Sequence, residues 1–183
     1  FYPTHAAYLE ALATAMREEY RAIVNAGLDL QIDCPDLAMG RHTIFKAASD
    51  TAFLRHAEEQ VEALNYAIEG LPAERLRMYV SWGNYEGPHT HDIPLERILP
   101  VVLRAKPRQL LLEAATPGHQ HVVADRLERF AKVVGRERVI ASTDSGFAAF
   151  AGDRMVDAKV AYAKLGSLVK GAQIATKRLW GRG

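Results

Sequence analysis

The chain has 183 residues, of which 49% are hydrophobic and 25% are charged, and its formal net charge is +1. This composition is typical of a globular protein with a buried core, and it excludes an intrinsically disordered chain. A nearly neutral chain has no strong field to attract nucleic acid or an anionic membrane, so we expect neither as a partner. The single cysteine, Cys34, excludes an internal disulfide and favours a cytoplasmic location.

Helical and strand patterns alternate along the chain. Apolar residues at helical spacing predict helices over residues 6–26, 50–69, 94–105, 122–134 and about 153–180. Alternating or continuous apolar runs predict strands over residues 28–33, 77–82, 109–114 and 138–144. Asp92 is expected to cap the helix over 94–105, and Pro100 is expected to kink or delay that helix. A helix followed by strand–helix units predicts an α/β fold with parallel strands and right-handed crossovers.

Four strands do not close a barrel, so the predicted sheet is either open or part of a barrel. In both cases functional residues gather where strands end and loops begin. The residues at the predicted strand ends are Asp33, Cys34, Asp36, Ser81, Trp82, Asn84, Glu113, Asp144 and Ser145.

Two carboxylates at these strand ends suggest a binding site. Asp33 could bind an amine or a metal, although an aspartate that caps the following turn fits equally well. Glu113 follows three leucines, and an acid at the end of a buried strand must be paired, hydrated or protonated. We therefore favour a functional site over a structural ion pair at Glu113. Trp82 could stack on a flat ligand, and ordinary packing explains it as well.

Four histidines lie in two His-x-His pairs within predicted loops, and these are His89, His91, His119 and His121. With Glu113 they could assemble a metal site, which would point to an unrelated metal hydrolase. Solvated loop histidines are the simpler interpretation, because no further ligand spacing accompanies the pairs. Cys34 has no base beside it in the sequence, so a buried and inert thiol is favoured over a nucleophile.

Four segments resemble the cobalamin-independent methionine synthase family, in particular its short, single-barrel bacterial members. They are LQIDCPDLAM, YVSWGNYEGPHTHDIPL, LLLEAATPGHQH and GRERVIASTDSGF. The resemblance runs across nearly the whole chain in the same order. It implies that residues 1–183 form a single domain that resembles the C-terminal half of the catalytic domain. That domain would be part of a (β/α)8 TIM-type barrel, with about four parallel strands each followed by a helix.

The resemblance also implies a function in methionine biosynthesis. Members of the family transfer a methyl group from 5-methyltetrahydrofolate to the thiol of homocysteine, with a bound zinc ion that stabilises the thiolate. The aspartate that contacts the amino group of the substrate corresponds to Asp33. Asp36, Trp82 and Asn84 are expected to line the substrate pocket. The implied activity is that of an S-methyltransferase with a homocysteine-like thiol as its small-molecule substrate.

The zinc site implied by the resemblance is largely substituted in this chain. Its His-x-Cys pair falls on Tyr79 and Ser81, its glutamate on Glu113, and its late cysteine on Ser145. A phenol and two alcohols are poor zinc ligands compared with imidazole and thiolate. We therefore expect zinc binding to be weak or lost and activity to be impaired.

The resemblance further implies that the N-terminal strands of the family barrel and one late strand are absent from these 183 residues. Open edges on such a sheet would pair with another chain, so a homodimer or a companion chain that completes the barrel is expected. The alternative to an active methyltransferase is a zinc-free, non-catalytic relative that binds a small molecule or a partner chain.

Overall fold

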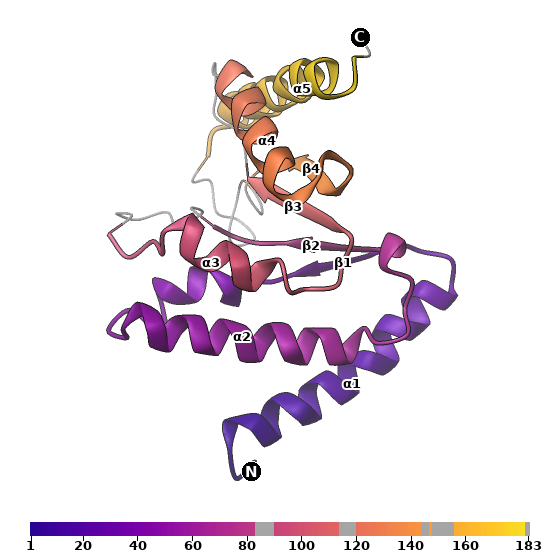
Figure 1. Ribbon diagram of the computed structural model, residues 1–183, viewed down its shortest axis with the longest axis vertical. Coiled ribbons are helices and arrows are strands. Elements are labelled where there is room, and N and C mark those ends of the chain that lie inside the picture. Colours follow the sequence, from indigo (N-terminus) through magenta and orange to yellow (C-terminus); the bar gives the residue numbers. More distant parts are fainter. Residues whose placement is uncertain (83–89, 114–119, 144–146, 148–155, 182–183) are drawn as a thin grey trace. The chain divides into compact units, whose positions relative to one another are not determined.

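The computed structural model describes residues 1–82, 90–113, 120–143, 147 and 156–181. The chain divides into two compact units, Phe1–Gln109 and Leu110–Gly183. Each unit is an assembly of parallel strands and helices, as Figure 1 shows. In the described part of the chain, no helix combines the length and hydropathy of a membrane-spanning segment.

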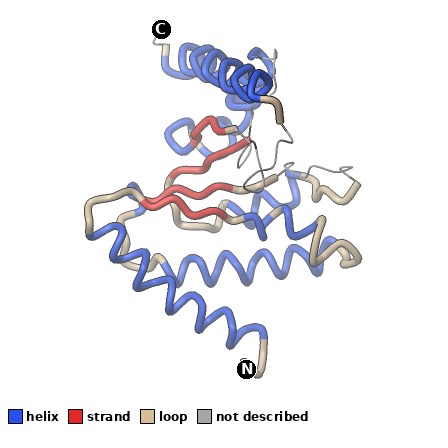
Figure 2. The backbone as a smooth tube through the Cα atoms, turned by 180° about the vertical axis from the view of Figure 1, so that it is seen from behind, coloured by secondary structure: helices blue, strands red, loops and turns tan. Residues whose placement is uncertain are grey.

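The first unit has two strands that alternate with three α-helices. Its elements are α1 (His5–Asn25), β1 (Leu30–Asp33), η1 (Pro35–Leu37), η2 (Met39–Arg41), α2 (Asp50–Ala67), η3 (Ala73–Arg75), β2 (Leu76–Tyr79) and α3 (Leu95–Val102). β1 and β2 are parallel, with Leu30 opposite Leu76 and Asp33 opposite Tyr79. Figure 2 shows the two strands side by side, with α1 and α2 running along one side of them.

α1 and α2 form where the sequence supplies both a cap and an apolar stripe. The Thr4 hydroxyl accepts a hydrogen bond from the Ala7 amide at 3.1 Å, and the Ser49 hydroxyl accepts one from the Ala52 amide at 3.2 Å. Each cap satisfies an amide that would otherwise lack a partner at the start of its helix. The two helices pack on each other, and the side chains that they bury are Leu9, Ala13, Phe53, Ala57, Val61 and Ala67.

The predicted cap of α3 is wrong. α3 begins after Pro94, and no side chain caps it. Asp92 instead forms a hydrogen bond with His42, so its carboxylate is engaged by the preceding loop. Pro100 lies inside α3, which ends at Val102, before its predicted end at residue 105.

The second unit contains the other strand pair. Its elements are β3 (Gln109–Glu113, of which Gln109 belongs to the first unit), α4 (Gln120–Val134), η4 (Arg136–Arg138), β4 (Val139–Ser142) and α5 (Ala158–Trp180). β3 and β4 are parallel, with Glu113 opposite Ser142. α4 and α5 pack together around Val123, Leu127 and Ala175. The Asp157 carboxylate accepts a hydrogen bond from the Lys159 amide, so α5 begins after Asp157 and later than predicted.

The predicted α/β fold with four parallel strands that alternate with helices is confirmed. β2 ends at Tyr79, earlier than the predicted end at residue 82. The expected single domain over residues 1–183 stays a prediction.

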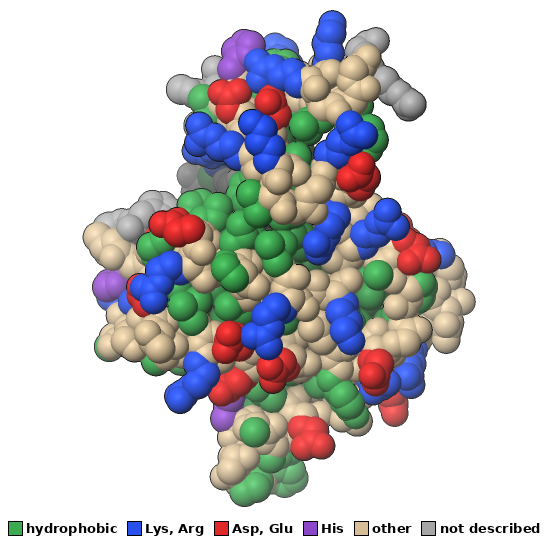
Figure 3. Space-filling model, viewed as in Figure 1, with side chains coloured by type: hydrophobic (Ala, Val, Ile, Leu, Met, Phe, Trp, Pro, Cys, Tyr) green, Lys and Arg blue, Asp and Glu red, His purple; other side chains and the backbone are tan. Residues whose placement is uncertain are grey.

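Charged side chains of both signs are interspersed on the face shown in Figure 3. In the first unit, for example, Arg104 binds Glu58 and Glu62 on α2, at 3.0 Å in each case. Exposed ion pairs of this kind contribute little to stability, roughly 0–1 kcal/mol each. The mixed surface agrees with the net charge of +1.

Candidate functional site

The carboxyl ends of β1 and β2 place Asp33 beside Tyr79. The two residues are directly opposite each other in the parallel register. The amide of Cys34 donates to the carbonyl of Tyr79 at 2.9 Å, which extends the pairing beyond the end of β1. Asp33 is exposed, and the Gln31 amide donates to its Oδ1 at 3.2 Å. An exposed carboxylate that a neighbour orients is available to a cationic group of a ligand.

Tyr79 and Ser81 are buried at this strand end. Their exposed fractions are 3% and 4%. The Tyr79 hydroxyl has no hydrogen-bond partner among the described residues. A buried hydroxyl without a partner is energetically unfavourable. The Tyr79 hydroxyl is therefore a buried polar group at this strand end whose hydrogen-bonding capacity no described residue satisfies.

A buried histidine joins the two loops that follow β1 and β2. His42, in the loop after β1, contacts the Asp92 carboxylate, in the loop after β2, with 2.5 Å between Nε2 and Oδ1. The His42 side chain is 3% exposed and the Asp92 side chain 26%. The His91 ring lies edge-on to the His42 ring, with 6.2 Å between the centroids. This contact holds the two loops together next to the strand ends.

Sequence reasoning did not identify His42. The residue belongs to no motif, and its partner lies far along the chain. A signal was nevertheless present, because a histidine in a loop between a strand and a helix is at the place where functional residues of parallel α/β folds occur.

Trp82 is held in place by its indole. The indole N–H donates to the carbonyl of Ile93 at 2.9 Å, and the side chain is half-buried. This bond ties the end of β2 to the residues just before α3. The expected contact between Trp82 and a substrate stays a prediction.

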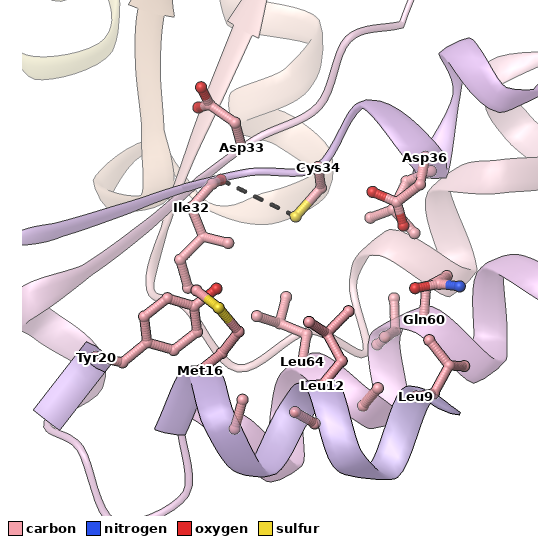
Figure 4. A pocket seen from close by; sticks show the side chains of 15 residues that line it. Leu9, Leu12, Met16, Tyr20, Ile32, Asp33, Cys34, Asp36, Gln60 and Leu64 are labelled. Atoms are coloured by element: carbon pink, nitrogen blue, oxygen red, sulfur yellow. Dashed lines mark hydrogen bonds between the residues drawn. The ribbon is translucent and has the colours of Figure 1, made fainter. Parts of the chain in front are cut away.

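Asp36 and Cys34 lie on the other side of β1 from the Asp33 side chain. Together with Asp33 they line a cavity of about 230 Å³ whose other lining residues come mainly from α1 and α2. Figure 4 shows the Cys34 sulfur and the Asp36 carboxylate on the cavity side, whereas the Asp33 side chain extends from the opposite side of the strand. Alternation along a strand accounts for the separation of Asp33 and Cys34. Asp33 and Asp36 therefore line the same cavity, with the Asp33 carboxylate directed away from it, and the expected contact of Asp36 with a substrate stays a prediction.

Burial raises the pKa of the Asp36 carboxyl, and a hydrogen bond with its own backbone and the charge of His56 oppose the rise. Because the folded-state pKa lies above the usual value of 3.8, the unfolded chain ionises first as the pH increases. Ionised Asp36 therefore destabilises the fold at neutral pH, and this penalty disappears below the usual value. We expect Asp36→Asn to be more stable than the native chain at pH 7, with a difference that narrows as the pH falls. Urea unfolding at a series of pH values measures the free energy of unfolding of both proteins. A difference between them that widens at low pH would contradict the expectation.

Cys34 is buried, as the sequence predicted. Burial raises the pKa of its thiol, and the nearby carboxylates of Asp36 and Asp33 raise it further. The thiol is therefore protonated at neutral pH, and its sulfur contacts the carbonyl of Ile32 at 4.0 Å. Since the thiolate is the reactive form, we expect alkylation by iodoacetamide to be at least about 100-fold slower in the native protein than in the unfolded chain. Mass spectrometry over time measures both rates, and similar rates would show that the thiol is accessible.

Several predicted site residues are only partly described. Asn84, His89, His119 and Ser145 lie outside the described residues. The backbone of Glu113 pairs with Ser142 at the end of β3, and its side chain lies outside the description. His91 lies beside His42 in the first unit, and His121 is exposed on α4 in the second. The alternative of a metal site formed by the two His-x-His pairs with Glu113 is not tested by the described residues.

Comparison with known proteins adds one likeness. No family model matches the sequence, and no curated protein does. A solved structure matches over 99% of this chain, with a TM-score of 0.69 and 19% sequence identity. It is a B12-independent methionine synthase from Shewanella sp. W3-18-1 in complex with selenomethionine.

The chain shares the fold of the part of this methionine synthase that it matches. The likeness confirms the predicted part of a TIM-type barrel, and at this identity it concerns the fold alone. The chain spans 58% of the length of that enzyme chain.

Proposed function

We propose that the carboxyl ends of β1 and β2 bind an amino acid of the homocysteine or methionine class, with Asp33 accepting the amino group. The observation that carries this proposal is the exposed Asp33 carboxylate at the end of β1, beside Tyr79 and oriented by Gln31. The sequence resemblance assigns the amino-group contact to the same aspartate. The similar fold belongs to a protein in complex with selenomethionine, an amino acid of the proposed class.

The chemistry of Asp33 suits an ammonium group. A carboxylate and an ammonium form charge-assisted hydrogen bonds, which are stronger than neutral ones. Gln31 occupies one site on Oδ1, and a carboxylate has further acceptor sites for a ligand. The hydrogen bond with Gln31 restrains the carboxylate before the ligand arrives, which lowers the entropy cost of binding.

The zinc ion of the methionine synthase family does not fit the described donors. Two of the implied ligand positions hold Tyr79 and Ser81, whose side chains are a phenol and an alcohol. Protein zinc sites use thiolate, imidazole and carboxylate ligands. The Tyr79 hydroxyl is buried and has no hydrogen-bond partner among the described residues. We therefore derive no zinc-dependent step from these residues.

Methyl transfer from 5-methyltetrahydrofolate to the homocysteine thiol is the reaction that the sequence resemblance implies. Free thiols are mostly protonated at neutral pH, and the hydroxyls of Tyr79 and Ser81 supply neither the positive charge nor the metal that lowers the pKa of a thiol. We expect this chain to form no methionine above background from the two substrates, with or without added zinc. Chromatographic detection of methionine measures this. Zinc-dependent formation of methionine would extend the proposal from binding to catalysis. It would also contradict the expected loss of methyltransferase activity.

The test of binding compares ligands that differ in one group. Calorimetric titration with L-methionine, L-homocysteine and 4-(methylthio)butanoate, which lacks the amino group, isolates the contact assigned to Asp33. We expect the amino acids to bind about 10- to 100-fold more tightly than the analogue, because a hydrogen bond to a charged group contributes about 1.5–3 kcal/mol. Equal affinities for methionine and the analogue would contradict the assignment.

A further inference from the structure

A group of metal-ligating side chains lies away from the strand ends, where the start of α1 meets α2. It consists of His5, His56 and Glu59, and their candidate ligand atoms all lie within 4.8 Å of one another. His5 is the first residue of α1. His56 and Glu59 are three residues apart on α2, a spacing that puts both on one face of the helix. Two residues of one helix and one of another therefore converge.

The His56 ring is restrained by its neighbours. It packs against the Phe45 ring, with 4.3 Å between centroids, and against the His5 ring at 5.5 Å. The Gln60 side-chain nitrogen lies 3.3 Å from Nε2 of His56. These contacts hold the imidazole of His56 beside His5 and Glu59.

We propose that His5, His56 and Glu59 bind a divalent transition-metal ion that joins α1 to α2. Two imidazole nitrogens and a carboxylate oxygen are typical ligands of zinc and related first-row ions, whereas calcium and magnesium prefer oxygen alone. Ligand atoms on one zinc ion lie about 3 to 4 Å apart. Small side-chain rotations would bring the group, now within 4.8 Å, to that geometry. Three protein ligands leave a position for water.

The site is independent of the proposed amino-acid site. Its ligands come from α1 and α2, and none of them is a residue at the ends of β1 and β2. The Asp36 carboxylate acts on His56 through its charge, so it is a negative neighbour of the site. A metal that joins the two helices would stabilise the fold in the absence of any amino acid.

The test is a calorimetric titration of the full chain, stripped with chelator and then titrated with zinc chloride without an amino-acid ligand. We expect one ion per chain, with affinity reduced at least about 10-fold in His5→Ala, His56→Ala and Glu59→Gln. Glu18→Gln, which removes the charge of an exposed glutamate on α1, is the matched control for Glu59→Gln and should bind as the native chain does. Cobalt absorption of the native chain, lost in His56→Ala, gives a second readout.

A thermal shift keeps the proposal testable if one variant is poorly folded. Zinc at about 100 times its Kd should raise the Tm by about 5–10 °C, and this rise should vanish in Glu59→Gln, whose side chain is exposed. Circular dichroism checks that each variant is folded. Absence of zinc binding, or unchanged affinity in His56→Ala and Glu59→Gln, would overturn the proposal. Loss of binding in Glu113→Gln would overturn it too, since the ion would then be held elsewhere.

Discussion

Replacing Asp33 by asparagine should lower the affinity for L-methionine by about 10- to 100-fold. Asparagine keeps the shape of the side chain and an oxygen that can accept the hydrogen bond of Gln31, but it loses the charge that attracts the ammonium group. The side chain is exposed, so the fold should not change. Calorimetric titration of both proteins with L-methionine measures the difference.

Asp29→Asn is the matched control for Asp33→Asn. Asp29 lies just before the other end of β1, where its carboxylate binds Arg75 at 2.6 Å and Arg77 at 3.1 Å. These pairs are largely exposed, so their loss should cost little stability. We expect methionine affinity to be unchanged in Asp29→Asn. The same loss of affinity in both variants would indicate a general charge effect, and no loss in Asp33→Asn would contradict the assigned role.

Replacing His42 by alanine should reduce the free energy of unfolding by about 2–4 kcal/mol. The imidazole is almost completely buried and contacts Asp92 at 2.5 Å. Its removal leaves a cavity. The Asp92 carboxylate, whose side chain is only 26% exposed, also loses its hydrogen bond with the imidazole. Because the pair joins the loops after β1 and β2, methionine binding should weaken as well. Urea unfolding measures the stability, and titration measures the binding.

Two control experiments distinguish the loss of the contact between His42 and Asp92 from a general effect of mutation. His121→Ala removes an exposed histidine from α4 and should change stability by less than about 0.5 kcal/mol. A double-mutant cycle with Asp92→Asn should give a coupling free energy of at least about 1 kcal/mol between His42 and Asp92. Additive effects of the two substitutions would show that the contact contributes nothing to stability.

Much of the fold could be predicted from local patterns. Thr4 and Ser49 mark the starts of α1 and α2, and the apolar stripes give their buried faces. The end of β2 could not be predicted in this way, because Val80 and Ser81 are buried like strand residues although the strand ends at Tyr79. Burial and strand pairing are separate properties. The pattern of apolar residues indicates which residues are buried, but it does not indicate where strand pairing ends.

Only those residues of the candidate site that lie at strand ends could be predicted from the sequence. Asp33 was placed correctly at the end of β1, because this position depends on local alternation. Asp36 lines the cavity beside α1 and α2 together with Asp33, but the Asp33 carboxylate is directed away from that cavity, and its direction follows from alternation along the strand. His42 and Asp92 are 50 residues apart, and no local pattern connects them. Such contacts depend on how the loops pack, which one sequence alone does not reveal.

The most direct test is to locate the ligand. A crystal of this protein grown with L-selenomethionine would show the position of the ligand selenium by anomalous scattering. We expect the ligand at the carboxyl ends of β1 and β2, with its amino nitrogen within hydrogen-bonding distance of the Asp33 carboxylate. A ligand in the cavity between α1 and α2, or no bound ligand at saturating concentration, would contradict the proposed function.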